Sequence, residues 1–230
     1  MSGAIKTQGT KLGIQSVTGA VSVEFDATAG TIERATGDWT TDYAVGMIVT
    51  TSDTDNPGPY IITALTSTVM TVAGQSKGHA GTSDFVGTAD AVMTTDATPA
   101  SFTITGYKPI GEVVDFDGPG GSASVGDATS LDSVAKEKIM GLPDEGQLSF
   151  NLIFVPGNPG QVAYRTARRT QAKTNFLLVL SDATDTKAAT TAAFAGFALE
   201  FPISGAVDDK VSASAVIEIT GEVDWSDEAA

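Results

Sequence analysis

Strict alternation of apolar and polar side chains constrains this chain more than any other feature. Three segments place an apolar residue at almost every second position: 148–154, 193–203 and 211–225. Their apolar positions are Leu148, Phe150, Leu152 and Phe154; Ala193, Ala195, Phe197, Leu199, Phe201 and Ile203; and Val211, Ala213, Ala215, Ile217, Ile219, Val223 and Trp225. A period of two is the repeat of a β-strand, so these segments are predicted to be half-buried antiparallel strands. The segment 176–180 (FLLVL) is apolar throughout, which indicates a strand covered on both faces.

One segment, from about residue 159 to 173, is typical of a helix. Asn158 suits the N-cap and Pro159 suits the first helical position. The residues expected to face inward are Tyr164, Ala167 and Gln171. A second stripe at helical spacing is basic and consists of Arg165, Arg168, Arg169 and Lys173. This stripe is either a solvated helix face or a basic surface that meets acidic groups on a neighbouring subunit.

Residues 22–95 differ from the rest of the chain in having many short strand patterns and frequent turns. Within them, 31–72 is typical of a small β-barrel, with a turn at 55–58 and strands at 60–65 and 69–72. Its apolar positions are Trp39, Tyr43, Val45, Met47 and Val49. The segment 75–87 is rich in glycine and serine and is predicted to be a loop or linker. We therefore expect an inserted β domain at 22–95, and a main domain built from an N-terminal arm (1–21) and residues 96–230. The expected class is all-β with one helix, a β-sandwich or barrel carrying an inserted small β-barrel.

Patterns of catalysis and ligand binding are missing or weak. The chain has no cysteine, which excludes disulfides and thiolate chemistry. His79, the single histidine, lies in a predicted loop without a nucleophile-elbow motif, and there is no phosphate-binding loop. Residues 115–127 hold three aspartates, but their spacing does not match a calcium loop, which favours a flexible acidic loop. Asp144–Glu145 and Asp208–Asp209 are adjacent pairs typical of turns. The expectation is therefore no enzyme activity, no cofactor and no metal.

The formal net charge of −15 opposes binding to nucleic acid. The N-terminus has no apolar signal-peptide core, and no apolar run approaches the ~20 residues of a membrane-spanning helix. The chain is therefore expected to stay in a cytosol, or to be exported without a Sec signal, and to have no membrane partner.

Several short motifs, taken in order, resemble the major tail tube protein of long-tailed bacteriophages. They are GTKLGI (9–14), IGEVVDFDGP (110–119), TSLDS (129–133), GLPDEGQLSF (141–150), PGNPGQVAYR (156–165) and the closing strand 211–225. Together they cover most of 96–230 and the N-terminal arm. Residues 31–72 resemble a small β module found in other tail proteins, which is not part of the minimal tail tube pattern.

This resemblance implies a virion subunit, usually in six copies per ring, whose rings stack into a hollow tail tube that delivers DNA to the host. The polar connection 117–146 would then be a long loop that reaches the adjacent ring or subunit, and the N-terminal arm would pack between rings. The implied contact residues are Asp117, Asp127, Thr129, Asp132, Ser133, Lys136, Lys138, Asp144, Arg165, Arg168 and Arg169. An acidic lumen would let DNA slide without binding, and the inserted domain would lie outside the tube. Implied partners are other copies of the chain, a tape-measure protein, and tail terminator and distal tail proteins, with assembly in the host cytoplasm.

Other interpretations remain open at this stage. A head decoration protein or minor tail protein would share the all-β composition without forming long tubes. A carbohydrate-binding β-sandwich would need exposed aromatic side chains, for which Trp39, Tyr43 and Tyr60 are the candidates, although Trp39 is expected to be buried. A carboxylate-based hydrolase is disfavoured because no acidic pair has suitable spacing.

Overall fold

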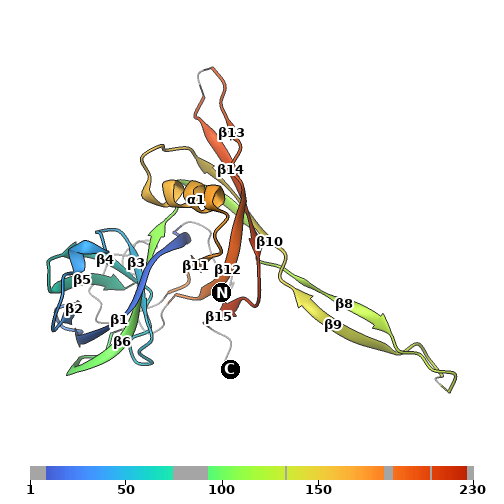
Figure 1. Cartoon of the computed structure of the whole chain (residues 1–230), viewed down its shortest axis with the longest axis horizontal. Helices are drawn as coiled ribbons and strands as arrows, with labels where there is room; N and C mark the ends of the chain where they lie inside the picture. The colour runs from blue at the N-terminus through green and yellow to red at the C-terminus, as the bar shows by residue number, and fades with distance from the viewer. Residues whose placement is uncertain (1–8, 75–92, 133, 184–188, 208, 227–230) are drawn as a thin grey trace, which may run out of the picture.

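The computed structural model describes residues 9–74, 93–132, 134–183, 189–207 and 209–226, and in them the chain is mostly β with one α-helix (Figure 1). The N-terminal half contains β1 (Lys11–Asp26), β2 (Thr31–Arg34), the 3-10 helix η1 (Trp39–Thr41), β3 (Ile48–Thr51), β4 (Tyr60–Leu65), β5 (Val69–Gly74) and β6 (Asp96–Pro109). The C-terminal half contains β7 (Val113–Asp117), β8 (Ser122–Asp127), β9 (Lys138–Asp144), β10 (Gln147–Ile153), α1 (Pro159–Thr170), β11 (Thr174–Val179), β12 (Thr191–Glu200), β13 (Ile203–Ser204), β14 (Ser212–Ile219) and β15 (Asp224–Trp225). The predicted class, all-β with one helix, is confirmed.

A closed barrel forms one end of the molecule. Six strands follow each other in the order β2-β5-β4-β3-β6-β1, and pairing between β1 and β2 closes the ring. The barrel is filled by large apolar side chains, among them the fully buried Trp39, Tyr60 and Met70. The predicted strand pair of β4 and β5 and the predicted burial of Trp39 are confirmed. Val45, predicted as an apolar barrel position, is instead 62% exposed.

The long strand β1 is shared between the barrel and the neighbouring sheet. β1 pairs with β6 from Gly13 to Phe25, and the end of β1 near Lys11 also pairs with β11 of the neighbouring sheet. Within the expected N-terminal arm, residues 11–21 are strand. The backbone groups of this segment bond to two neighbouring strands, an arrangement that its Gly-, Ser- and Thr-rich sequence does not reveal. The expected boundary between residues 21 and 22 falls inside β1. Residues 75–87, including His79, lie outside the described residues.

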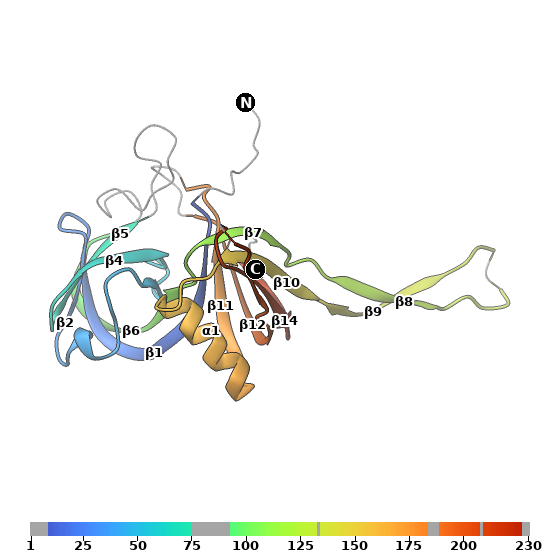
Figure 2. The same ribbon diagram turned by 90° about the horizontal axis from the view of Figure 1, so that it is seen from above.

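The second unit is a sheet that continues from β1 in the order β11-β12-β14-β10-β7, with α1 packed on one face. Figure 2 shows the helix lying across these strands. β10 and β14 bury the predicted face, and β11 is buried on both faces as predicted. The face predicted for β12 is wrong: Ala192, Phe194 and Ala198 are buried, whereas Phe197 and Leu199 are exposed. Both faces of β12 carry apolar residues, so alternation alone could not select the inner one.

The helix α1 begins as predicted and ends three residues early. The side chain of Asn158 accepts a hydrogen bond from the Gln161 amide, and Pro159 occupies the first turn. Tyr164 and Ala167 are buried as expected. The prediction that Gln171 faces inward is wrong. The residue adopts the left-handed C-cap conformation (φ 55°) and is exposed. A left-handed residue commonly ends a helix, which places its side chain outside the helical stripe.

The polar connection 117–146 is not a loop. β8 and β9 pair antiparallel from Ser122↔Asp144 to Asp127↔Lys138 and form a separate two-stranded sheet. Figures 1 and 2 both show this hairpin extending away from the body of the molecule, on the side opposite the barrel. The two strands satisfy each other's backbone groups without burying a core, which explains why the segment lacks the apolar periodicity of the other strands.

Candidate assembly surfaces

The hairpin β8–β9 exposes apolar side chains that no other described part of the chain covers. Every residue of β9 is exposed, and Val125 and Met140 are directly paired across the two strands. The exposed large apolar side chains of the hairpin and its tip are Val125, Leu131, Val134, Ile139, Met140 and Leu142. A two-stranded hairpin with no packed face is at best marginally stable in water, and exposed apolar surface of this kind typically marks an interaction site. The sequence reasoning missed these residues, although the apolar letters of KIMGL (138–142) were a signal.

The predicted contact residues of the hairpin lie along its length and at its tip. Asp127 accepts a hydrogen bond from the Thr129 amide at 2.9 Å, and the Thr129 hydroxyl accepts one from the Glu137 amide at 3.0 Å. These bonds tie the two strand ends together at the start of the tip. The side-chain hydrogen bond from Thr129, followed by the backbone one, lowers the pKa of Asp127 below its ordinary value. The predicted residue Ser133 lies outside the described residues.

The remaining charged candidates of the hairpin are all exposed. Asp132 and Lys136 lie at the tip, Lys138 begins β9 opposite Asp127, and Asp144 ends β9, where it accepts a hydrogen bond from the Gly146 amide at 3.0 Å. The structure therefore brings Asp127, Thr129, Asp132, Lys136 and Lys138 together at one end of the hairpin. Asp144 lies at the opposite end, near the body of the molecule.

The sheet has an open face on the side away from α1, and it has an open edge at β7. On that face, Asp115 lies opposite Asn151, Asp117 lies opposite Ser149, and Glu218 lies opposite Gln147. Two of these pairs are hydrogen-bonded: the Asn151 amide donates to Asp115 at 2.7 Å, and the Gln147 amide donates to Glu218 at 2.6 Å. The strands β7, β10, β12 and β14 contain no lysine or arginine. β7 pairs with β10 on one side and ends the strand order of the described sheet, so its other side is an unpaired edge.

The arginines in the basic stripe of α1 differ in what they contact. Arg165 lies over the Phe154 ring at 5.3 Å and donates to the Pro156 carbonyl, while its Nε has no hydrogen-bond partner among the described residues. Arg168 donates from Nε to the Leu199 carbonyl at 2.9 Å. These two guanidinium groups therefore connect the helix to neighbouring backbone of the same chain. Arg169 is exposed on the last turn of the helix.

A buried side-chain amide, that of Gln161, fixes α1 to the sheet, and no sequence pattern predicted it. Gln161 is fully buried, its side-chain oxygen accepts from the Val155 amide at 2.9 Å, and its side-chain nitrogen donates to the Gly111 and Ile153 carbonyls at 3.0 Å. A single glutamine at a helix start resembles any solvated one, because nothing local shows that three backbone groups converge on it.

The described residues contain no group of three or more acidic or histidine side chains placed to hold a metal ion. In the same residues, no helix is long and apolar enough to cross a membrane. Trp39, Tyr43 and Tyr60 are all buried in the barrel, so the aromatic residues that a carbohydrate-binding surface would have needed are not available on its exterior.

The described fold is that of an all-β structural protein. Its main exposed features, the β8–β9 hairpin and the open face and edge of the sheet, suit contacts with other proteins and not catalysis. The family model described as phage tail tube protein, TTP, lambda-like matches residues 92–229, from just before β6 to the end of the described chain, and the protein belongs to this family. It is therefore a structural protein of the phage tail, and family membership implies a non-enzymatic role. No curated protein matches the sequence. Strands β1 to β5 lie outside the matched range, although β1 pairs with both β6 and β11 inside it.

Proposed function

We propose that copies of this chain assemble into rings, six per ring, that stack into the hollow tail tube through which DNA passes to the host. The observation that carries this proposal is the projecting β8–β9 hairpin, with its exposed apolar residues and no core of its own. A neighbouring copy would cover this surface, and family membership supports self-association in the tail. The contact residues proposed for the hairpin are Asp127, Thr129, Asp132, Ser133, Lys136, Lys138 and Asp144, and those for the body are Asp117, Arg165, Arg168 and Arg169.

The unpaired edge of β7 supports ring closure. Unpaired edge strands offer a row of amides and carbonyls to another chain, and closing sheets into a continuous barrel removes such edges. A ring in which each β7 pairs with a strand of the next copy would join the sheets around a central bore. Asp117 at the end of β7 would then lie at the contact between subunits.

The open acidic face of the sheet is the proposed lining of this bore. Asp115, Asp117 and Glu218 lie on the face opposite the helix, and the strands that form it carry no cation. Such a wall repels the phosphate backbone and lets duplex DNA slide without specific binding. The barrel would lie outside the tube, because a domain of its size should not share a bore with duplex DNA. A tape-measure protein and the terminator and distal tail proteins are proposed partners, and assembly is proposed to occur in the host cytoplasm.

Negative-stain electron microscopy of the purified chain over a concentration series, with sedimentation alongside, tests the proposal. Hollow tubes with a regular axial repeat, or discrete rings, are the expected result. A strictly monomeric species at every concentration, both alone and with tail initiator proteins added, would contradict it.

A further inference from the structure

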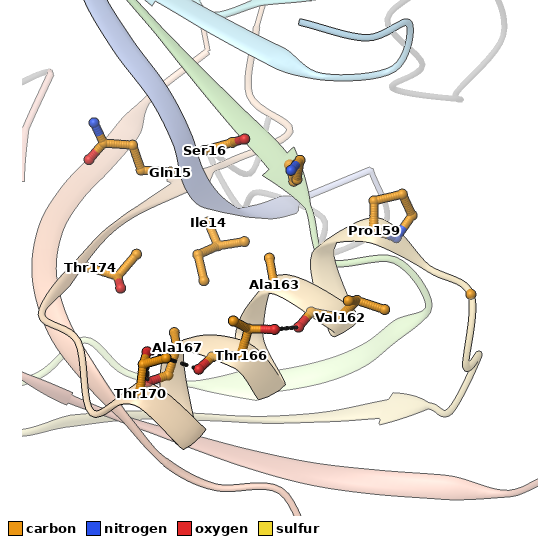
Figure 3. A pocket seen from close by; sticks show the side chains of 12 residues that line it. Ile14, Gln15, Ser16, Pro159, Val162, Ala163, Thr166, Ala167, Thr170 and Thr174 are labelled. Atoms are coloured by element: carbon orange, nitrogen blue, oxygen red, sulfur yellow. Dashed lines mark hydrogen bonds between the residues drawn. The ribbon is translucent and has the colours of Figure 1, made fainter. Parts of the chain in front are cut away.

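A surface groove lies between the helix α1 and the strands β1 and β6. It has a volume of about 600 Å³ and is the space shown in Figure 3. Ile14 of β1 and Ala163 and Ala167 of α1 line its interior, and Val162 of α1 is 41% exposed at its side. Ile14 and Ala167 are buried and form the floor of the groove, so its accessible apolar surface comes from Val162 and the partly buried Ala163.

The hydroxyl groups along the helix side of the groove are already used by the helix itself. Thr166 donates its hydroxyl to the Val162 carbonyl at 2.9 Å, and Thr170 donates to the Thr166 carbonyl at 3.0 Å (Figure 3). These hydroxyls are therefore already engaged with the helix backbone. A segment with branched apolar side chains matches this wall better than a polar ligand would.

One charged group stands beside the groove. Lys108 lines it and lies directly opposite Ile14 in the register of β1 and β6. No ion pair of Lys108 is found within the part of the chain that the structure describes. An occupant that combines apolar side chains with a carboxylate would therefore match both the groove and its lysine.

The tip of the β8–β9 hairpin has this combination. Leu131 and Val134 are fully exposed there, and Asp132 stands next to Leu131 in the chain. The groove lies at the junction of barrel and helix, whereas the hairpin extends from the other side of the body (Figures 1 and 2). Each chain thus carries one tip and one groove on different parts of its surface, so the hairpin of one copy has to reach a second copy to fill the groove.

We propose that the hairpin tip of one copy docks into the α1–β1 groove of another, with Leu131 and Val134 against the apolar interior and Asp132 facing Lys108. The contact is heterologous, because the two surfaces differ, and heterologous contacts repeat from subunit to subunit without pairing off into closed dimers. This inference rests on the proposed tube function and names the receiving surface for the hairpin.

The absence of cysteine makes engineered disulfides a direct test. Chains with Leu131→Cys at the tip are assembled with chains carrying Ser16→Cys, a near-isosteric change at an exposed groove position, and oxidised with copper–phenanthroline. A covalent heterodimer that disappears on reduction is the expected result. The matched control pairs Leu131→Cys with Ser67→Cys, an exposed serine on the barrel away from the groove, which should give no heterodimer. Chains with Leu131→Cys alone report any contact between tips.

A second variant measures the contribution of the contact. Leu131→Asp is expected to raise the concentration needed for assembly by about tenfold or more, because burial of one leucine is lost. Val45→Asp, at an exposed apolar position on the barrel, should leave that concentration unchanged. Wild-type tubes combined with no Ser16 cross-link and no effect of Leu131→Asp would overturn the docking and leave the tube function standing. Failure of the wild-type chain to associate under any condition would overturn both.

Discussion

The barrel and the hairpin are both antiparallel sheets of this chain, yet they treat their apolar residues in opposite ways. The barrel closes on itself through β1 and β2 and surrounds Trp39, Tyr60 and Met70, all fully buried. The hairpin stays open and leaves the whole of β9 exposed. Closure removes edges and supplies a core, so the barrel can be stable without a partner. The hairpin gains neither, which supports the proposal that neighbouring copies supply its stabilising contacts.

Removing the hairpin should separate these two behaviours most clearly. A variant that deletes residues 122–144 joins Gly121 to Glu145, and the deleted ends are cross-strand partners, so the connection needs little rearrangement. We expect a folded monomer with a nearly unchanged melting temperature by circular dichroism, and no tubes in electron micrographs. Tubes of normal length from this variant would show that the hairpin is dispensable and that the comparison between the two regions is misplaced.

Truncating one apolar side chain in each region should give opposite results. Trp39→Ala removes a fully buried side chain whose indole nitrogen donates to the Thr68 carbonyl, and is expected to lower the free energy of unfolding by about 3–5 kcal/mol. Met140→Ala in the hairpin should change the free energy of unfolding of the monomer by no more than about 0.5 kcal/mol, and should weaken assembly instead. Urea denaturation of both monomers measures the first effect and sedimentation the second. Equal losses of monomer stability would mean that the hairpin packs within its own chain.

An intermediate effect is expected at the helix that covers the sheet. Gln161→Leu leaves the Val155 amide and the Gly111 and Ile153 carbonyls without their side-chain partner, which should cost about 1–3 kcal/mol. Arg169→Ala, an exposed change on the same helix, serves as the control and should remain within about 0.5 kcal/mol. Denaturant unfolding curves of the two variants measure these changes in the free energy of unfolding. If both behave alike, the buried amide network does not hold the helix to the sheet.

The smallest effect concerns the turn at the hairpin tip. Since the pKa of Asp127 is lowered in the folded chain, the ionised carboxylate stabilises the turn above the ordinary aspartate pKa, and this is lost as the pH falls through the lowered value. Thr129→Val removes the side-chain hydrogen bond and should move the pKa of Asp127 back toward its ordinary value. Carboxyl titration by NMR measures this shift. An identical titration curve in the variant would exclude the Thr129 hydroxyl as the cause.

The sequence predicted the strands that bury one face, and it failed where both faces or neither face is apolar. β10 and β14 alternate cleanly, and their buried sides were found correctly. β12 presents apolar residues on both sides, so Phe197 and Leu199 were assigned inward although they are exposed. The hairpin and the middle of β1 (15–22) carry no fully buried residues among those described, so their strand pairing leaves little trace in the sequence pattern. The groove of Ile14 and Ala163 joins segments almost 150 positions apart, which no local pattern reveals.

The shared strand β1 also determines how a force on the barrel reaches the rest of the molecule. β1 runs from the barrel into the body as one continuous strand: residues 11–14 pair with β11, and a register shift against β6 follows between Gln15 and Val17. A force applied to the barrel would therefore pass along β1 to its pairing with β11 at residues 11–14. Displacement of the barrel would then act on the part of the sheet where β1 and β11 pair, and would turn the subunit that carries the barrel.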